Sequence, residues 1–151
     1  MQEKKISIAS DHAGCVMKAM IVEYLRSKNH IVIDLGAFDS DVPVDYADQA
    51  DKVAKSLYRH ESDFGVLLCG TGVGMSIAIN RYPFVRGALV SDVHVAELSR
   101  QHNNANVLVL GARVLDEETA IACLEVFLNT PFEGGRHEVR VKKLGELPHA
   151  L

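Results

Sequence analysis

The sequence predicts an α/β fold in which a parallel sheet lies between two layers of helices. Short apolar runs typical of buried strands alternate five times with segments whose apolar residues recur at helical spacing. The strand runs are apolar almost throughout, as in parallel strands that are covered on both faces. We therefore predict one domain over residues 1–151, a three-layer α/β/α sandwich with a five-stranded parallel, Rossmann-like sheet.

The individual elements follow from these two patterns. The segments with strand composition are 5–9, 31–35, 64–69, 87–90 and 107–110. Helical periodicity follows each strand, over about 14–28, 46–59, 73–80, 93–102 and 116–128. Gly36 closes the second strand, and the acidic stretch 37–45, which contains Pro43, is expected to be a loop. The tail from Gly134 onward predicts a short basic helix.

Composition limits the class of protein. A chain of 151 residues can bury a core without disulfide bonds. The formal charge of −4 leaves no excess of lysine and arginine for coating nucleic acid. The three cysteines are an odd number without paired spacing, which favours a reducing compartment. We see no signal-peptide pattern and no long apolar run, so we expect a cytoplasmic protein that does not bind membranes.

The loop after the third predicted strand is the most distinctive motif. Cys69 ends the strand, and glycine then recurs at every second position in Gly70-Thr71-Gly72-Val73-Gly74. Backbone N–H groups in such a turn can bind an anion. They also favour the thiolate form of a neighbouring cysteine, so Cys69 is a candidate nucleophile or general base. The alternative is a cysteine buried for packing, the role expected of Cys15 and Cys123 in their helices.

Polar residues also follow the other strands. Asp11 and His12 come after the first strand, where Asp11 is either a helix cap or a ligand-binding group. Arg113 comes just after the fifth strand. In a parallel α/β fold these positions share the carboxyl edge of the sheet, where ligands bind. We therefore expect the site at that edge.

A second set of candidates lies outside the strand ends. His102 and Asn103 come at the end of a helix, where a histidine is often only a partner of the helix dipole. Arg136 and Arg140 are four residues apart and share a helix face, which suits a phosphate, although a solvated basic face is the ordinary interpretation. The histidines lack the short spacing of metal ligands, so we expect no metal and no other cofactor.

Taken together, these motifs resemble the ribose-5-phosphate isomerase B family, which includes isomerases that act on galactose 6-phosphate. The resemblance extends over nearly the whole chain. Its blocks are Ser10-Asp-His-Ala-Gly14, Asp45-Tyr46, Cys69-Gly-Thr-Gly-Val-Gly74, Ser76-Ile-Ala-Ile-Asn80, Leu98-Ser-Arg-Gln-His-Asn103, Asn106-Val-Leu, Gly111-Ala-Arg113 and Phe132-Glu-Gly-Gly-Arg-His137. One branch of the family uses a glutamate base just after the glycine loop. Met75 occupies that position here, so the chain is similar to the cysteine branch.

The resemblance implies an aldose–ketose isomerase that interconverts D-ribose 5-phosphate and D-ribulose 5-phosphate, a step of the non-oxidative pentose phosphate pathway. Cys69 would move a proton between C1 and C2. The enediolate charge would be held by Gly70, Thr71, Gly72, Val73, Gly74 and Asn103. His102, aided by Asp11 and Thr71, would open the furanose ring. Tyr46 and Asp11 would contact sugar hydroxyls, and the phosphate would be bound by His12, Arg113, Arg136 and Arg140.

The resemblance also implies a homodimer or homotetramer whose active site is shared between subunits. The partner would be a small sugar phosphate, not a nucleic acid. Two alternatives stay open. One is an isomerase of a six-carbon sugar, allose 6-phosphate or galactose 6-phosphate. The length of the substrate pocket would distinguish it from the five-carbon enzyme. The other is a phosphate- or nucleotide-binding module without catalysis, in which Cys69, His102 and Asp11 are incidental.

Overall fold

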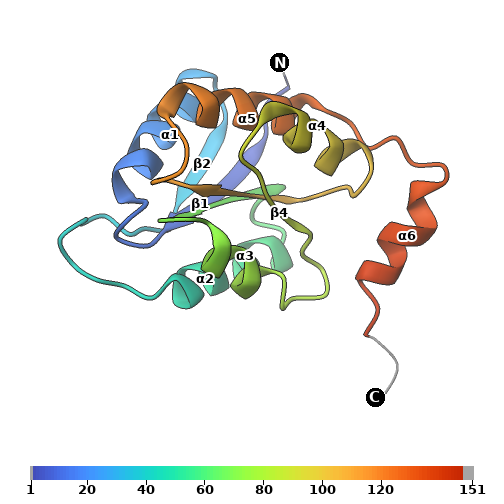
Figure 1. Cartoon of the computed structure of the whole chain (residues 1–151), viewed down its shortest axis with the longest axis horizontal. Helices are drawn as coiled ribbons and strands as arrows, with labels where there is room; N and C mark the ends of the chain where they lie inside the picture. Colours follow the sequence, from blue (N-terminus) through green and yellow to red (C-terminus); the bar gives the residue numbers. More distant parts are fainter. Residues whose placement is uncertain (1, 148–151) are drawn as a thin grey trace.

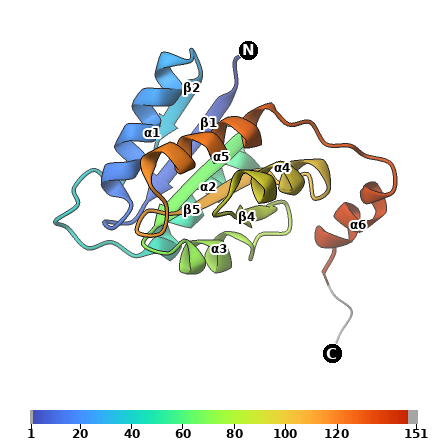
Figure 2. The same cartoon turned by 45° about the horizontal axis from the view of Figure 1, so that its top comes forward.

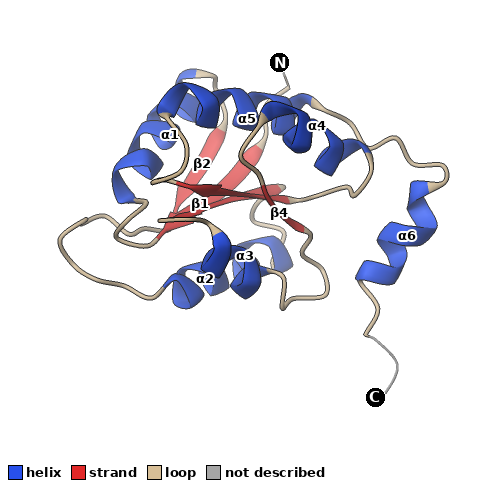
Figure 3. Cartoon of the chain, viewed as in Figure 1, coloured by secondary structure: helices blue, strands red, loops and turns tan. Residues whose placement is uncertain are grey.

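A five-stranded sheet lies between two layers of helices, as the sequence predicts (Figure 1). The structure is a computed structural model that describes residues 2–147. The strands are β1 (Lys5–Ser10), β2 (Ile31–Asp34), β3 (Phe64–Cys69), β4 (Gly87–Leu89) and β5 (Val107–Gly111). The helices are α1 (Cys15–Ser27), α2 (Tyr46–Tyr58), α3 (Val73–Ile79), α4 (Val93–Gln101), α5 (Glu117–Asn129) and α6 (His137–Leu144). Figure 3 distinguishes these elements by type.

Most observed bounds lie within one residue of the predicted ones. The structure places Asp116 just before α5 rather than inside it, because its carboxylate accepts a hydrogen bond from the Thr119 N–H at 2.7 Å and caps the helix. His102 likewise follows α4 as its C-cap. The final helix begins at His137, three residues after the predicted start, because Gly134 and Gly135 form a turn with positive φ angles of 68° and 55°.

All strands are parallel, in the order β2-β1-β3-β5-β4. α1, α4 and α5 cover one face of the sheet, and α2 and α3 cover the other (Figure 1). The helix after β1 therefore lies on one face, and the helix after β3 lies on the opposite face. The chain segments diverge at the carboxyl ends of these two neighbouring strands, which is where doubly wound folds bind ligands.

Alternate residues of the central strands face opposite layers. On β3, Val66 and Leu68 pack with α1 and α5, whereas Leu67 and Cys69 pack with α2 and α3. Cys69 therefore faces the α2–α3 layer. α6 stands apart from both layers (Figure 2). Within residues 2–147, every helix is too short or too polar to span a bilayer.

A buried ion pair joins the first helix to the end of the second strand. Lys18 is only 2% exposed, and its Nζ lies 2.6 Å from Asp34 Oδ1. The same carboxylate oxygen accepts the Gly36 N–H at 3.1 Å. Backbone hydrogen bonds then join Gly36 and Ala37 to Ser10, the residue before Asp11. The ion pair thus holds the loop that borders the start of the site.

We expect Asp34→Ala to lower the free energy of unfolding by about 3–5 kcal/mol, because it leaves the Lys18 ammonium buried without a counter-charge. Adding Lys18→Met should restore part of the loss, since the uncompensated charge is then removed. Urea denaturation of the wild type, both single variants and the double variant measures the effect. An Asp34→Ala protein within about 1 kcal/mol of wild type contradicts this role for the pair.

Candidate active site

Cys69 ends β3 at the carboxyl edge of the sheet, with its side chain 4% exposed. Its Sγ accepts a hydrogen bond from the Gly72 N–H at 3.1 Å. A backbone donor aimed at sulfur stabilises negative charge on it. Cys69 thus packs in the α2–α3 layer and also contacts a backbone donor. Cys15 and Cys123 are buried within α1 and α5, as predicted.

The glycine loop that follows is shaped by one positive φ angle and close packing. Gly72 has φ of 81°, and a Cβ there would collide with the Leu89 side chain. A side chain at this position would also be strained by the backbone conformation. The loop presents Thr71 and Val73 to solvent, and Thr71 Oγ1 accepts the Val73 N–H at 3.3 Å. Gly72 is thus the residue that lets the loop turn its N–H toward the sulfur.

Asp11 and His12 follow β1, directly beside the loop. The Asp11 N–H donates to the Leu68 carbonyl at 3.2 Å, so the residue lies one strand away from Cys69. One carboxylate oxygen of Asp11 accepts the Gly14 N–H at 3.1 Å, so it organises the turn into α1 although Gly14 is the N-cap. His12 Nδ1 accepts the Val44 N–H at 3.3 Å. In the neutral ring that bond leaves Nε2 as the donor.

Tyr46 and Arg113 complete this edge from two other elements. Tyr46 begins α2, and its ring packs so closely over Gly74 that a Cβ there would lie 2.7 Å from Cζ. Arg113 donates its N–H to the Gly70 carbonyl at 2.9 Å, and its guanidinium lies beside Gly70. A thiol, a carboxylate, an imidazole, a phenol and a guanidinium thus gather around the glycine loop.

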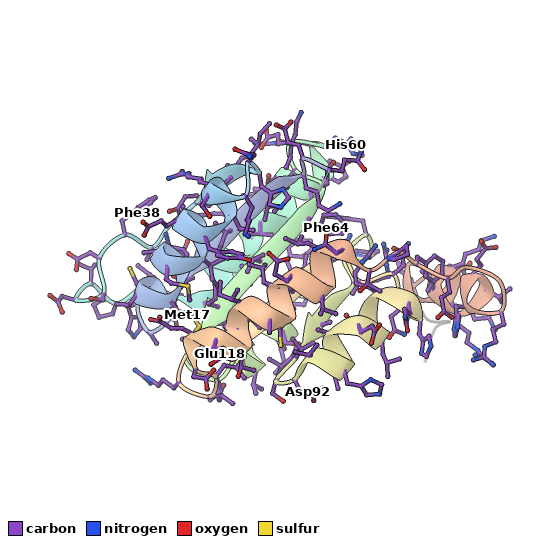
Figure 4. All side chains as sticks on the ribbon, turned by 90° about the horizontal axis from the view of Figure 1, so that it is seen from above. Met17, Phe38, His60, Phe64, Asp92 and Glu118 are labelled. Atoms are coloured by element: carbon purple, nitrogen blue, oxygen red, sulfur yellow. The ribbon has the colours of Figure 1, made fainter. Side chains whose placement is uncertain are left out.

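The other predicted residues lie at the opposite edge of the sheet within one chain. α4, capped by Asp92 after β4, carries the chain back to the amino edge of the sheet, where His102 and Asn103 precede β5. Figure 4 shows Asp92 and Glu118, which follow β4 and β5, toward one edge of the sheet, and His60, which precedes β3, toward the other. Cys69 is level with Gly111, whereas Val107 starts β5. At about 3.3 Å per residue, that strand alone separates the two groups by about 13 Å.

Arg136 and Arg140 belong to this second group. Both are exposed at the start of α6, which lies beyond the end of α4 (Figure 2). The structure therefore brings Asp11, His12, Tyr46, Cys69 and Arg113 together, and it brings His102, Asn103, Arg136 and Arg140 together. It does not bring the two groups together in one chain.

The second group also includes Glu133 and His137, to which the sequence analysis assigned no role. The imidazoles of His102 and His137 stack with centroids 4.4 Å apart and planes inclined by 16°. Within residues 2–147, these rings and the Glu133 carboxylate form the one His/Cys/Asp/Glu cluster close enough to hold a metal ion, with ligand atoms within 4.8 Å of one another. A metal binds in the plane of an imidazole, so near-parallel rings do not share one ion without turning. In the sequence, the only indication that His137 belongs near this group is that it directly follows Arg136.

A groove of about 530 Å³ runs along the β4 edge and reaches Asn103. Its lining residues are Asn80, Val85, Arg86, Gly87, Ala88, Val95, Leu98, Ser99, Asn103, Ala105 and Leu144. A smaller depression of about 480 Å³ borders His12 and the start of α2. The groove thus belongs to the second group, and the depression belongs to the first.

The fold is that of a doubly wound α/β protein, and the first group places a thiol and backbone N–H groups at the switch point of the sheet, where such folds bind small molecules. Residues 6–144 match the model of one family, described as Ribose/Galactose Isomerase. The chain belongs to this family.

Similar proteins agree with that assignment. The chain is 42% identical over 141 residues to ribose-5-phosphate isomerase B of Escherichia coli, covering 93% of this chain and 94% of the relative. The crystal structure of a ribose 5-phosphate isomerase from Thermotoga maritima matches with a TM-score of 0.94 at 49% identity, covering 97% of this chain and all of that one. A structure from Mycoplasma genitalium with bound ribulose 5-phosphate has a TM-score of 0.88 at 44% identity, covering 93% of each chain.

We expect Gly72→Ala to slow alkylation of Cys69, because a Cβ at positive φ displaces the N–H that contacts Sγ. The strain should also lower the free energy of unfolding by about 1–3 kcal/mol. Gly70→Ala is the matched control, since a Cβ there meets only ordinary contacts at 3.4 Å or more. Peptide mass spectrometry after chloroacetamide treatment measures the rate, with Cys15 and Cys123 as internal references. Equal rates in both variants would show that the Gly72 N–H does not activate the thiol.

Proposed function

We propose that this protein interconverts D-ribose 5-phosphate and D-ribulose 5-phosphate through an enediolate. The observation that carries the proposal is the contact of Cys69 Sγ with the Gly72 N–H, at the carboxyl edge of a chain in the isomerase family. Relatives named ribose-5-phosphate isomerase B, and a similar structure with ribulose 5-phosphate bound, support the five-carbon substrate. Met75, at the glutamate position of the other branch, is fully buried in the α2–α3 layer, which supports Cys69 as the base.

Cys69 serves as the carbon base. In the open aldehyde form of the substrate, the thiolate removes the C2 proton, and the electron pair moves through C1 to O1. The N–H groups of Gly70–Gly74 stabilise the enediolate oxygens, which is where backbone donors contribute most to rate. The O2 hydroxyl proton passes to O1, the proton on the thiol returns to C1, and O2 becomes the ketone oxygen while O1 becomes a hydroxyl. The low exposure of Cys69 supports this role, because a carbon base works best with little competing water.

Ring opening and phosphate binding require the second group of residues. His102, with Asp11 and Thr71, transfers protons between the C1 hydroxyl and the ring oxygen, and Asn103 adds a donor to the enediolate. His12 and Arg113 bind the phosphate together with Arg136 and Arg140. Because the two groups lie at opposite edges of one chain, the second group comes from another copy. The protein thus works as a homodimer or homotetramer with shared sites.

An apolar surface beside the glycine loop supports docking of a second copy. Exposed apolar side chains project from β4, α3 and α4, namely Leu89, Val73, Ile77, Val93 and Val95. Leu89 packs against Gly72, so this surface borders the thiol loop directly. Exposed apolar patches of this kind are typical of protein–protein contacts. A copy that docks here brings its own α4 end and α6 toward the loop of the first.

The thiols favour a reducing compartment. All three cysteines are free and buried. The proposed reaction needs Cys69 as a thiolate, which oxidation would remove. We therefore assign the enzyme to the cytoplasm.

The wild-type protein should form ribulose 5-phosphate from ribose 5-phosphate without added metal or nicotinamide, and faster than it converts allose 6-phosphate or galactose 6-phosphate. Cys69→Ala should lower kcat at least about 10⁴-fold, because no other group takes the C2 proton. It should bind inorganic phosphate as the wild type does, since the cations remain. A coupled ketose assay and calorimetry measure the two effects. Normal turnover of Cys69→Ala contradicts Cys69 as the base. Faster turnover of a six-carbon sugar phosphate contradicts ribose 5-phosphate as the preferred substrate.

Mixing two inactive variants tests whether each site is shared. Cys69→Ala and His102→Asn chains that exchange subunits form hybrids with one intact site, in which Cys69 of one copy meets His102 of the other. A random two-fold symmetric mixture should recover about a quarter of wild-type activity. If the mixture stays as inactive as each parent although native mass spectrometry detects hybrids, the two residues do not act across the interface.

A further inference from the structure

His137 is a buried titratable residue that the proposed reaction does not use. Its side chain is 6% exposed. Within the described part of the chain, its Nε2 has no hydrogen-bond partner and lies 3.6 Å from Glu133 Oε2, beyond hydrogen-bond distance. Buried polar atoms are nearly always partnered, so an unpartnered one requires an explanation. We looked for the role of this residue in the group that its ring packs against, which is the imidazole of His102.

The ring of His137 stacks on that of His102, with centroids 4.4 Å apart and planes inclined by 16°. No hydrogen bond from residues 2–147 reaches the His102 side chain. His102 is the C-cap of α4, and its N–H donates to the Leu98 carbonyl at 2.9 Å, so the helix fixes its backbone. The stack is therefore the contact that orients this imidazole.

The chain builds the stack with local contacts. The Glu133 N–H donates to the Gln101 carbonyl at 3.1 Å, and Arg100 Nε donates to the Thr130 carbonyl at 3.2 Å. These bonds join the segment after α5 to the end of α4. The turn at Gly134 and Gly135 then starts α6 with His137 against His102.

The charges around His137 favour its neutral form. Burial lowers its pKa below the ordinary value, and nearby His102, Arg136 and Arg140 lower it further, while the Glu133 carboxylate opposes them. A group whose pKa is depressed in this way is neutral at pH 7. A neutral ring can stack on His102 in either protonation state of His102, whereas a charged ring would repel its protonated form.

We propose that His137 is a positioning residue for ring opening, which holds the His102 imidazole in the orientation needed to transfer protons to and from the furanose. This inference rests on the proposed function, in which His102 performs that step. It adds a requirement for an aromatic, uncharged ring at position 137. The ring itself does not touch the substrate in this role.

Two reactions separate ring opening from enolisation. Conversion of ribose 5-phosphate requires both steps, because this sugar is a closed furanose in solution. Exchange of the C1 proton of ribulose 5-phosphate in D2O requires only enolisation, because the phosphate occupies the oxygen that would close the ring. His137→Ala should lower kcat for ribose 5-phosphate about 10–100-fold, the cost of misplacing a catalytic group by about 1 Å. The rate of C1 proton exchange in this variant should stay within about threefold of wild type, a much smaller change than the loss expected in kcat.

Two further variants complete the experiment. His137→Phe keeps an uncharged aromatic ring, so it should recover most of the lost kcat. Lys143→Ala, an exposed change on the same helix, should behave as the wild type. Unchanged kcat in His137→Ala overturns the inference. An equal loss of exchange and conversion, with weaker binding of inorganic phosphate, also overturns it, because that result would indicate misplaced arginines. A wild-type protein that forms no ribulose 5-phosphate contradicts the proposed function itself.

Discussion

Parallel strands impose the constraint on which this site depends. Each helix must carry the chain from the carboxyl edge of the sheet back to the amino edge before the next strand can begin. Residues that follow strands therefore gather at one edge, and residues that end helices gather at the other. Cys69 and Asp11 belong to the first kind, and His102 belongs to the second. A reaction that needs both kinds of residue cannot be completed by one such chain, and this supports the shared site that we propose.

The carboxyl edge combines rigid and exposed parts. The central strands are buried toward their carboxyl ends, and they position Cys69 at the end of β3 and Asp11 just after β1. Around them, His12 and Arg113 lie on segments between strands and helices, and Tyr46 begins α2. The base is thus held by the core, and the groups proposed to bind the sugar and its phosphate lie where solvent and substrate can reach them. This division is typical of enzymes in which loops on a rigid scaffold carry the binding residues.

Much of this arrangement could be predicted from the sequence because it depends on local patterns. The strand that ends at Cys69 and the glycines after it form a continuous segment, and its bounds were correct. The position of β5 between β3 and β4 could not be predicted, because strand order depends on packing between distant segments. The Lys18–Asp34 pair joins residues 16 positions apart, and the stack of His102 on His137 joins residues 35 positions apart. No short sequence motif could therefore predict either contact. The assigned roles of the site residues remain predictions.

In the proposed reaction the glycine loop stabilises charge with its main chain, and this affects how the protein can evolve. A backbone N–H is present whichever residue occupies a position, except proline, so changes at Thr71 or Val73 do not delete a donor. The exposed Val73 side chain can vary without loss of its N–H, whereas the Thr71 hydroxyl has a proposed part in ring opening. Selection can therefore alter the side chains proposed to contact the sugar, such as Tyr46, while the proposed donors for the enediolate persist. A family that includes isomerases of ribose and galactose phosphates is consistent with such separation of chemistry from substrate choice.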